Sequence, residues 1–274
     1  MTEEISLKDM QKISLEILKT IADICEAQGF RYFLIYGTLI GAVRHKGYIP
    51  WDDDVDIMMP RPDYDKLLAY LDTNFAGHPY LKVFNHDVCD AYPYMITRIS
   101  DDRYRIVMDN EKEYGMGIFI DIYPYDGLGG SKEEALAYGL EGDRLSSLCY
   151  QATRNRFAIE NTTSFLRKLI KFPVFLFAKL CGKDRFQDKL AELARRKDYD
   201  ASRYVGCIVW LSGGEKDIFE RAWFDEYDRM SFDKYEFRVP KAYDTVLRHI
   251  YGNYMELPPE KDRIGHHRYK VYKK

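Results

Sequence analysis

Three aspartates lie in segments that otherwise have the composition of apolar strands. Asp54 and Asp56 flank the start of a strand predicted over Val55–Met59. Alternate side chains of a strand share a face, so these two carboxylates would repel each other unless a cation lies between them. Carboxylate oxygens suit Mg²⁺ or Mn²⁺. The pattern therefore indicates a divalent metal site, with a solvated acidic turn as the alternative; Asp52 and Asp53 are interpreted as such a turn.

Asp121 is a third candidate ligand. It is the one charged residue in the apolar stretch 117–123, where a buried carboxylate is unfavourable without a charged partner. If this stretch pairs with Val55–Met59, the three carboxylates converge. Asp121 would then position a substrate hydroxyl group or take its proton, because it stands apart from the other two carboxylates. The alternative is a structural ion pair with Arg98 or Arg105.

Gly37 and Thr38 lie between a predicted strand, 30–36, and a predicted short helix, 39–45. Glycine lets a ligand approach the backbone, the first N–H groups of a helix can bind an anion, and the threonine hydroxyl adds a donor. Arg44 and Lys46 follow and could bind phosphate oxygens, the arginine through its planar fork. Solvent exposure is the alternative for both cations. Together with the aspartates, this arrangement is typical of phosphoryl transfer.

Several classes of protein could use these residues. A phospho-alcohol transferase, a nucleotidyltransferase and a metal-dependent glycosyltransferase all need acidic metal ligands. The Gly-Thr pair before the acids and the isolated Asp121 after them favour the first two. A non-catalytic binding module would be expected to lack part of the acid set, which is complete here. Because no Ser, Cys or His has a visible base beside it, we expect direct in-line displacement without a covalent intermediate.

Residues 37–56 resemble the LicD family, which belongs to the nucleotidyltransferase-fold superfamily and is related to the fukutin proteins. The first block reads Gly-Thr-Leu-Ile-Gly-Ala-Val-Arg-His and then Pro-Trp-Asp-Asp-Asp-Val-Asp. The likeness continues in Ile-Asp-Ile-Tyr-Pro at 120–124, and in Val-Pro, Tyr-Gly-Asn-Tyr and Leu-Pro-Pro between 239 and 259. It covers most of the chain, except the region of about 131–235, so the choice of acceptor stays open.

The resemblance implies transfer of a phospho-alcohol from a cytidine diphosphate donor to a glycan hydroxyl. The expected reaction moves phosphocholine from CDP-choline to a sugar of the teichoic-acid or lipopolysaccharide type, which could be lipid-linked, and releases CMP. A nucleotidyltransferase that releases pyrophosphate is the alternative. The resemblance assigns Mg²⁺ or Mn²⁺ binding to Asp54, Asp56 and Asp121, and contact with the donor phosphates to Gly37, Thr38 and Arg44.

The remaining sequence predicts the elements that position these residues, in an α+β fold. A first helix is expected over 6–28, with Ser6 as N-cap and Gly29 as its stop, and Pro62 begins a second that runs to about residue 71. Strand-like stretches cover 81–84, 94–99, 104–108 and 117–123. We expect a nucleotidyltransferase-like mixed sheet with a helical layer built largely from the second half of the chain.

Helical patterns dominate residues 131–199, with a capping box at Ser131 and Glu134 and a break near Pro173. Residues 204–211 could return to the sheet, and Pro240 is expected to open a last helix ended by Gly252. We expect one catalytic domain over 1–274, with a sheet core at about 30–125, a helical region at about 131–200 and a C-terminal segment, 236–274, that completes the site.

Composition excludes some classes of partner. A net charge of −3 disfavours nucleic acid, and no apolar run is long enough to cross a membrane. Five scattered cysteines without a C-x-x-C pair indicate free thiols in a reducing compartment. The acidic N-terminus lacks the core of a signal peptide. We therefore expect a cytoplasmic protein that could act at the inner face of the membrane.

Two segments have two interpretations each. Residues 164–183 are apolar and carry five cations, Arg167, Lys168, Lys171, Lys179 and Lys183. They form either a peripheral membrane contact or two core helices with solvated lysines, and the pattern favours core helices. The basic, aromatic end of the chain either closes the active site, with His267 or Arg263 against donor or acceptor, or forms a loose solvated tail, which is favoured.

Overall fold

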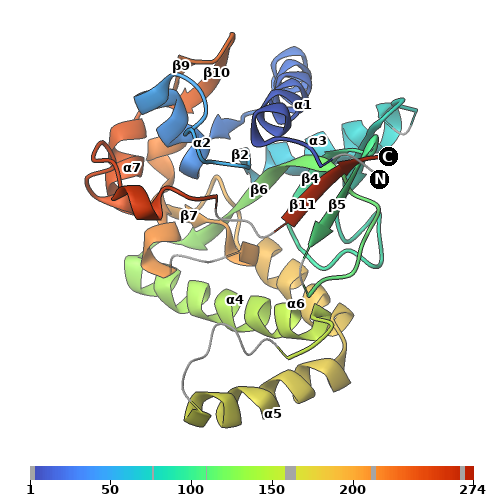
Figure 1. Ribbon diagram of the computed structural model, residues 1–274. Coiled ribbons are helices and arrows are strands. Elements are labelled where there is room, and N and C mark those ends of the chain that lie inside the picture. Colours follow the sequence, from blue (N-terminus) through green and yellow to red (C-terminus); the bar gives the residue numbers. More distant parts are fainter. Residues whose placement is uncertain (1–3, 76, 109, 158–164, 211–213, 266–268) are drawn as a thin grey trace.

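The computed structural model describes residues 4–75, 77–108, 110–157, 165–210, 214–265 and 269–274 (Figure 1). Its main sheet has the strand order β1-β2-β6-β4-β3. The bounds are β1 Phe33–Leu34, β2 Asp56–Pro60, β6 Ile118–Gly129, β4 Thr97–Asp101 and β3 Leu81–Phe84. β2 and β6 are parallel and the other pairs in this row are antiparallel, so the sheet is mixed. Beyond β6 the sheet continues through β7 (Tyr204–Gly206) to β8 (Phe219–Glu220).

Helix α1 (Leu7–Gln28) has the bounds that the sequence predicts. The Ser6 side chain accepts a hydrogen bond from the backbone N–H of Asp9, and Gly29 ends the helix with φ 72°. The apolar side of the helix packs over the sheet, and its Gln11 donates a hydrogen bond of 2.8 Å to the carbonyl of Asp52. Helix α1 thus contacts the acidic segment directly.

The junction between β1 and the next helix differs from the prediction. The strand expected over 30–36 is reduced to β1, and helix α2 (Tyr36–Ile40) continues as a π-helical turn over Gly41–His45. Gly37 and Thr38 therefore lie inside the first turn of α2. Tyr36 has φ 51°, in the left-handed region that a tyrosine rarely adopts, and this sharp change of direction ends the extended backbone early.

The helical layer comes largely from the second half of the chain, which confirms the predicted α+β class. Helices α4 (Lys132–Thr153) and α6 (Asp184–Arg195) pack on β6, and α5 (Phe165–Cys181) packs on α4, on the side away from the sheet (Figure 1). Ser131 caps α4 as predicted. The break expected at Pro173 is wrong, because α5 continues through this residue. Helix α3 (Arg61–Asn74) begins one residue before Pro62.

The late part of the chain contains strands that sequence patterns did not predict. β9 (Tyr227–Phe232) and β10 (Tyr235–Pro240) form a hairpin in which Pro240 pairs with Tyr227. Pro240 therefore ends a strand, and helix α7 (Tyr243–Tyr251) begins three residues later. β11 (Tyr269–Lys273) pairs with β5 (Tyr104–Met108), so these residues are not the loose tail that we expected.

Within these described ranges, no helix is both long and apolar enough to cross a bilayer. The five cysteines are unpaired, as predicted. That the chain forms one catalytic domain stays a prediction, as does its place in the cell.

Candidate active site

Three charged residues lie side by side on neighbouring strands. The sheet register pairs Asp56 of β2 with Asp121 of β6, and Asp121 with Arg98 of β4. Directly paired residues of neighbouring strands point to the same face. All three side chains are buried, with at most 6% of any residue exposed. The condition stated from the sequence, that the Asp121 strand pairs with the Asp56 strand, is therefore met.

Asp121 forms a buried ion pair with Arg98. The Arg98 Nε donates to Asp121 Oδ1 at 2.6 Å, and the guanidinium lies 4.2 Å from the centre of the Phe119 ring. Burial alone would lower the pKa of Arg98, but the Asp121 charge raises it well above its usual range. The ion pair weighed as the alternative for Asp121 is thus present. The hydrogen bond from Arg98 fixes the orientation of the Asp121 carboxylate, which favours a positioning role over a basic one.

Asp56 is a buried carboxylate among other carboxylates. Its Oδ1 has no hydrogen-bond partner among the described residues. Its pKa is raised well above the usual range, first by burial and then by the charges of Asp54, Asp121 and Asp52. A group in these surroundings must either take up a proton or meet a cation. Carboxylate oxygens are hard ligands, so the surroundings of Asp56 fit a divalent cation.

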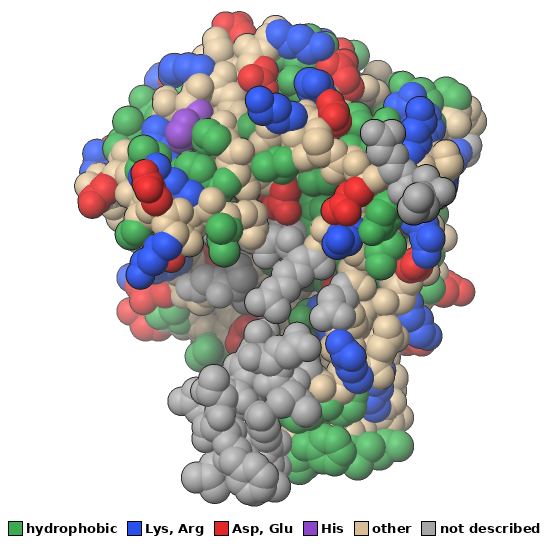
Figure 2. Space-filling model, in the orientation of Figure 1, with side chains coloured by type: hydrophobic (Ala, Val, Ile, Leu, Met, Phe, Trp, Pro, Cys, Tyr) green, Lys and Arg blue, Asp and Glu red, His purple; other side chains and the backbone are tan. Residues whose placement is uncertain are grey.

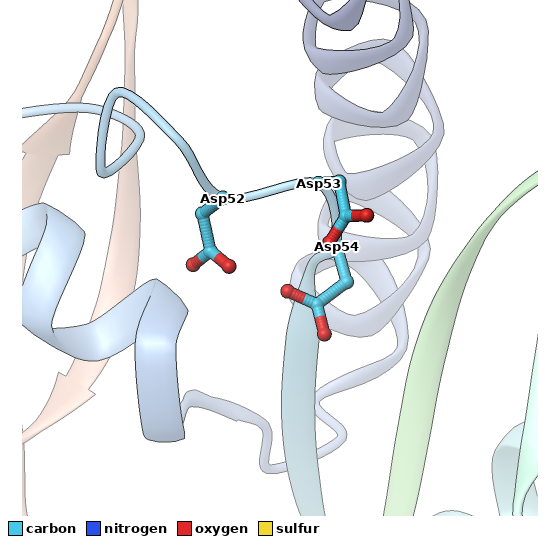
Figure 3. A group of neighbouring side chains, drawn as sticks. All are labelled: Asp52, Asp53 and Asp54. Carbon is cyan, nitrogen blue, oxygen red and sulfur yellow. The ribbon is translucent and has the colours of Figure 1, made fainter. Parts of the chain in front are cut away.

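The loop before β2 carries a compact acidic group. Carboxylate oxygens of Asp52, Asp53 and Asp54 all lie within 4.8 Å of one another (Figure 3). Asp54 precedes β2 rather than belonging to it. Only 7% of Asp52 is exposed, so its interpretation as part of a solvated turn is wrong.

Gly37 explains the burial of Asp52. A Cβ atom at position 37 would lie 2.7 Å from Asp52 Oδ2, so the glycine leaves space for this carboxylate. Sequence reasoning missed Asp52 because its burial depends on a residue of another element. The sequence signal that could have found it is the glycine at the junction before the predicted helix, because a missing side chain leaves room for a neighbouring group.

Thr38 fixes the start of β2. Its buried hydroxyl oxygen accepts a hydrogen bond of 2.9 Å from the backbone N–H of Asp56. The contact holds α2 against the strand that carries Asp56. The role assigned from sequence to Gly37 and Thr38, contact with donor phosphates, stays a prediction.

Arg44 contacts the segment after α7, and Lys46 lies beside the β9–β10 hairpin. Arg44 Nη1 donates to the carbonyl of Tyr254 at 2.5 Å, which joins the π-helical turn to the segment after α7. Lys46 is exposed and lines a cavity of about 780 Å³ between α1 and the turn of the β9–β10 hairpin. Their predicted contacts with phosphate stay predictions.

The C-terminal segment lies against the acidic loop. The Tyr269 hydroxyl donates to the carbonyl of Asp53 at 2.9 Å, and the Arg263 guanidinium lies 5.7 Å from the centre of the Trp51 ring. The pKa of Tyr269 is raised well above its usual range, by burial and then by the charges of Asp53 and Asp54. His267, the other predicted contact in this segment, lies outside the described residues.

Comparisons with known proteins agree with this geometry. The family model described as LicD/FKTN/FKRP, nucleotidyltransferase domain, matches residues 29–139, which contain all the acids discussed here. The lipopolysaccharide cholinephosphotransferase LicD of Haemophilus influenzae is 32% identical over 276 aligned residues, which cover 98% of this chain and 99% of that protein. The mouse and human ribitol 5-phosphate transferases FKRP are each 48% identical over 42 residues, 15% of this chain and 8% of theirs.

Proposed function

Because the chain belongs to the LicD family of phosphotransferases, we propose that it moves phosphocholine from CDP-choline to a glycan hydroxyl and releases CMP. A sequence identity of 32% to a cholinephosphotransferase, over nearly the whole length of both chains, supports the choice of phosphocholine. The same relative supports an acceptor of the lipopolysaccharide type, and one of the teichoic-acid type is the other candidate. The observation that carries the proposal is the buried row of Asp56, Asp121 and Arg98 beside the acidic loop.

We propose that Asp54, Asp56 and Asp121 hold Mg²⁺ or Mn²⁺. The unpartnered, buried Oδ1 of Asp56 and its raised pKa support this assignment. Asp52 adds a fourth carboxylate to the set. When bound, the cation supplies positive charge that stabilises the charge developing on the phosphate groups of the donor.

The residues of the chain then have separate tasks. Arg98 holds the Asp121 carboxylate in a fixed orientation, and Thr38 fixes the backbone at Asp56. Asp121 orients the acceptor hydroxyl for attack on the phosphorus that carries choline. As the new P–O bond forms, the P–O bond to CMP breaks and CMP leaves from the opposite side, while the proton of the hydroxyl passes to the released CMP or to solvent. Since a single displacement inverts the configuration at phosphorus, a donor with chirally labelled phosphorus should give an inverted product.

A product assay tests the proposed function. The purified chain is incubated with CDP-choline and either lipopolysaccharide or teichoic-acid acceptors, and the release of CMP and the gain of phosphocholine on the glycan are measured. CDP-ribitol is a parallel donor, because of the short match to the ribitol 5-phosphate transferases. Pyrophosphate release from CTP, with a nucleotidyl group left on the acceptor, would instead assign the chain to the nucleotidyltransferases. EDTA should abolish transfer, and full activity in excess EDTA would contradict the metal assignment.

A further inference from the structure

Helix α5 presents an outward face of apolar side chains. Phe172, Leu176 and Leu180 recur at intervals of four and form one stripe, which is half to four-fifths exposed. Val174 and Phe177 add further exposed apolar area. The opposite side packs on α4, where Ala178 is buried. Neither core helix expected from the sequence is therefore present, because a single helix turns its apolar side to the solvent.

The charge of this helix has one sign. Residues 165–181 contain four lysines and arginines and no acidic residue. Lys171 is exposed, and Lys179 Nζ donates to the carbonyl of Ala152 in α4 at 2.9 Å, which directs its ammonium toward α4. Burial lowers the pKa of Lys179, and the nearby positive charge of Lys112 lowers it further. An exposed apolar surface on a helix whose charged residues are all positive is complementary to a layer of anionic lipid headgroups over hydrocarbon.

We propose that the outward face of α5, formed by Phe172, Val174, Leu176, Phe177 and Leu180, lies on the surface of an anionic lipid bilayer. The helix lies on the bilayer and does not cross it, since no helix of the described ranges is long and apolar enough to span. A second copy of this chain fits less well, because two such faces would bring like charges together. Figure 1 shows α5 on the side of α4 that faces away from the sheet, and Figure 2 shows hydrophobic side chains gathered over it at the foot of the molecule.

Sedimentation with vesicles tests the proposal without any measurement of transferase activity. The full chain is mixed with vesicles of phosphatidylcholine alone, or of phosphatidylcholine with one-third phosphatidylglycerol, at low and high salt. We expect binding to the anionic vesicles that falls at least tenfold at high salt, because salt screens the lysines. Binding to neutral vesicles should be much weaker.

Two variants identify the surface. The double change Phe177→Glu and Leu180→Glu should reduce binding to anionic vesicles at least tenfold, and circular dichroism should show an unchanged fold because both side chains are exposed. Val88→Glu, at an apolar residue that is 61% exposed between β3 and β4, is the matched control and should bind as the unchanged protein does. Lys171→Glu should weaken binding and reduce its dependence on salt.

Three results would overturn the proposal. The first is no binding of the unchanged protein to anionic vesicles at low salt. The second is equal binding to neutral and anionic vesicles, which would remove the role of charge. The third is a dimer in light scattering that the double variant dissociates, which would show that a second copy covers this face.

Discussion

Charged side chains are buried where β2, β6 and β4 meet, whereas apolar side chains are exposed along α5. In the first region carboxylates lie together with one buried oxygen unpartnered, and a positive charge is needed to balance them. In the second region one side of α5 packs on α4, and the apolar side chains of the other side are exposed, so an apolar surface is needed to cover them. The two regions should therefore respond to different agents, the first to divalent cations and the second to lipid and salt.

The largest effect is expected at the first region. Asp56→Asn keeps the shape of the side chain and removes its charge, so turnover should fall at least about 10²-fold, the scale of losing one preorganised charge. The measurement is CMP release from CDP-choline with a glycan acceptor. Asp23→Asn, in an exposed ion pair of α1, is the control and should retain turnover. Near-normal turnover of Asp56→Asn would show that the Asp56 carboxylate is not needed for the reaction.

Removal of Arg98 tests the ion pair that sets this region apart. Arg98→Met should leave Asp121 buried without its partner and lower the free energy of unfolding by about 3–5 kcal/mol, measured in urea. The double variant Arg98→Met and Asp121→Asn should recover much of this loss, since no unpaired charge remains. If the loss of unfolding free energy in the double variant equals the sum of the losses in the two single variants, the two side chains do not stabilise each other.

When divalent cations are removed, Asp56→Asn should stabilise the protein, whereas most substitutions of buried residues destabilise it. Because the pKa of Asp56 is raised in the folded state, the unfolded chain releases this proton more readily, and stability falls as pH rises from about 4 through the folded pKa. In EDTA at neutral pH, Asp56→Asn should therefore melt at a higher temperature than the unchanged protein. The increase should be about 2–4 °C for each kcal/mol gained in the free energy of unfolding. The difference should vanish below about pH 4, where both states hold the proton. A lower melting temperature for the variant at neutral pH would contradict the burial of an uncompensated charge.

The smallest effect is expected from α5. The double change Phe177→Glu and Leu180→Glu should leave turnover on a soluble acceptor and the melting temperature within experimental error, because both side chains face solvent. A loss of turnover on a soluble acceptor would show that α5 affects the acids, and the two regions would no longer be independent.

Local signals predicted local structure well. Ser6 and Gly29 set the ends of α1, and the stretches 81–84 and 104–108 became β3 and β5 with the same bounds. Such signals act within a few residues, through caps and alternating side chains. The pairing of β2 with β6 could be stated from sequence only as a condition, because register depends on residues far apart in the chain.

The predictions that were wrong depend on contacts between residues far apart in the chain. The burial of Asp52 depends on the missing side chain of Gly37, and the strand at Tyr269–Lys273 depends on the free edge of β5. The apolar period of α5 is equally consistent with a core helix and with a helix on a lipid surface. Only the packing on α4 shows that one side of this helix stays uncovered.

The pairing of β5 with β11 joins two strands that the ribosome makes far apart in time. Tyr269 follows Met108 by roughly 160 residues, so at about 5–20 residues per second the edge of β5 waits on the order of ten seconds for its partner. An unpaired edge is a template for pairing with other chains. The nascent protein is therefore most prone to aggregate while α4 to α7 are being synthesised, and chaperones that shield strand edges should matter most in that interval.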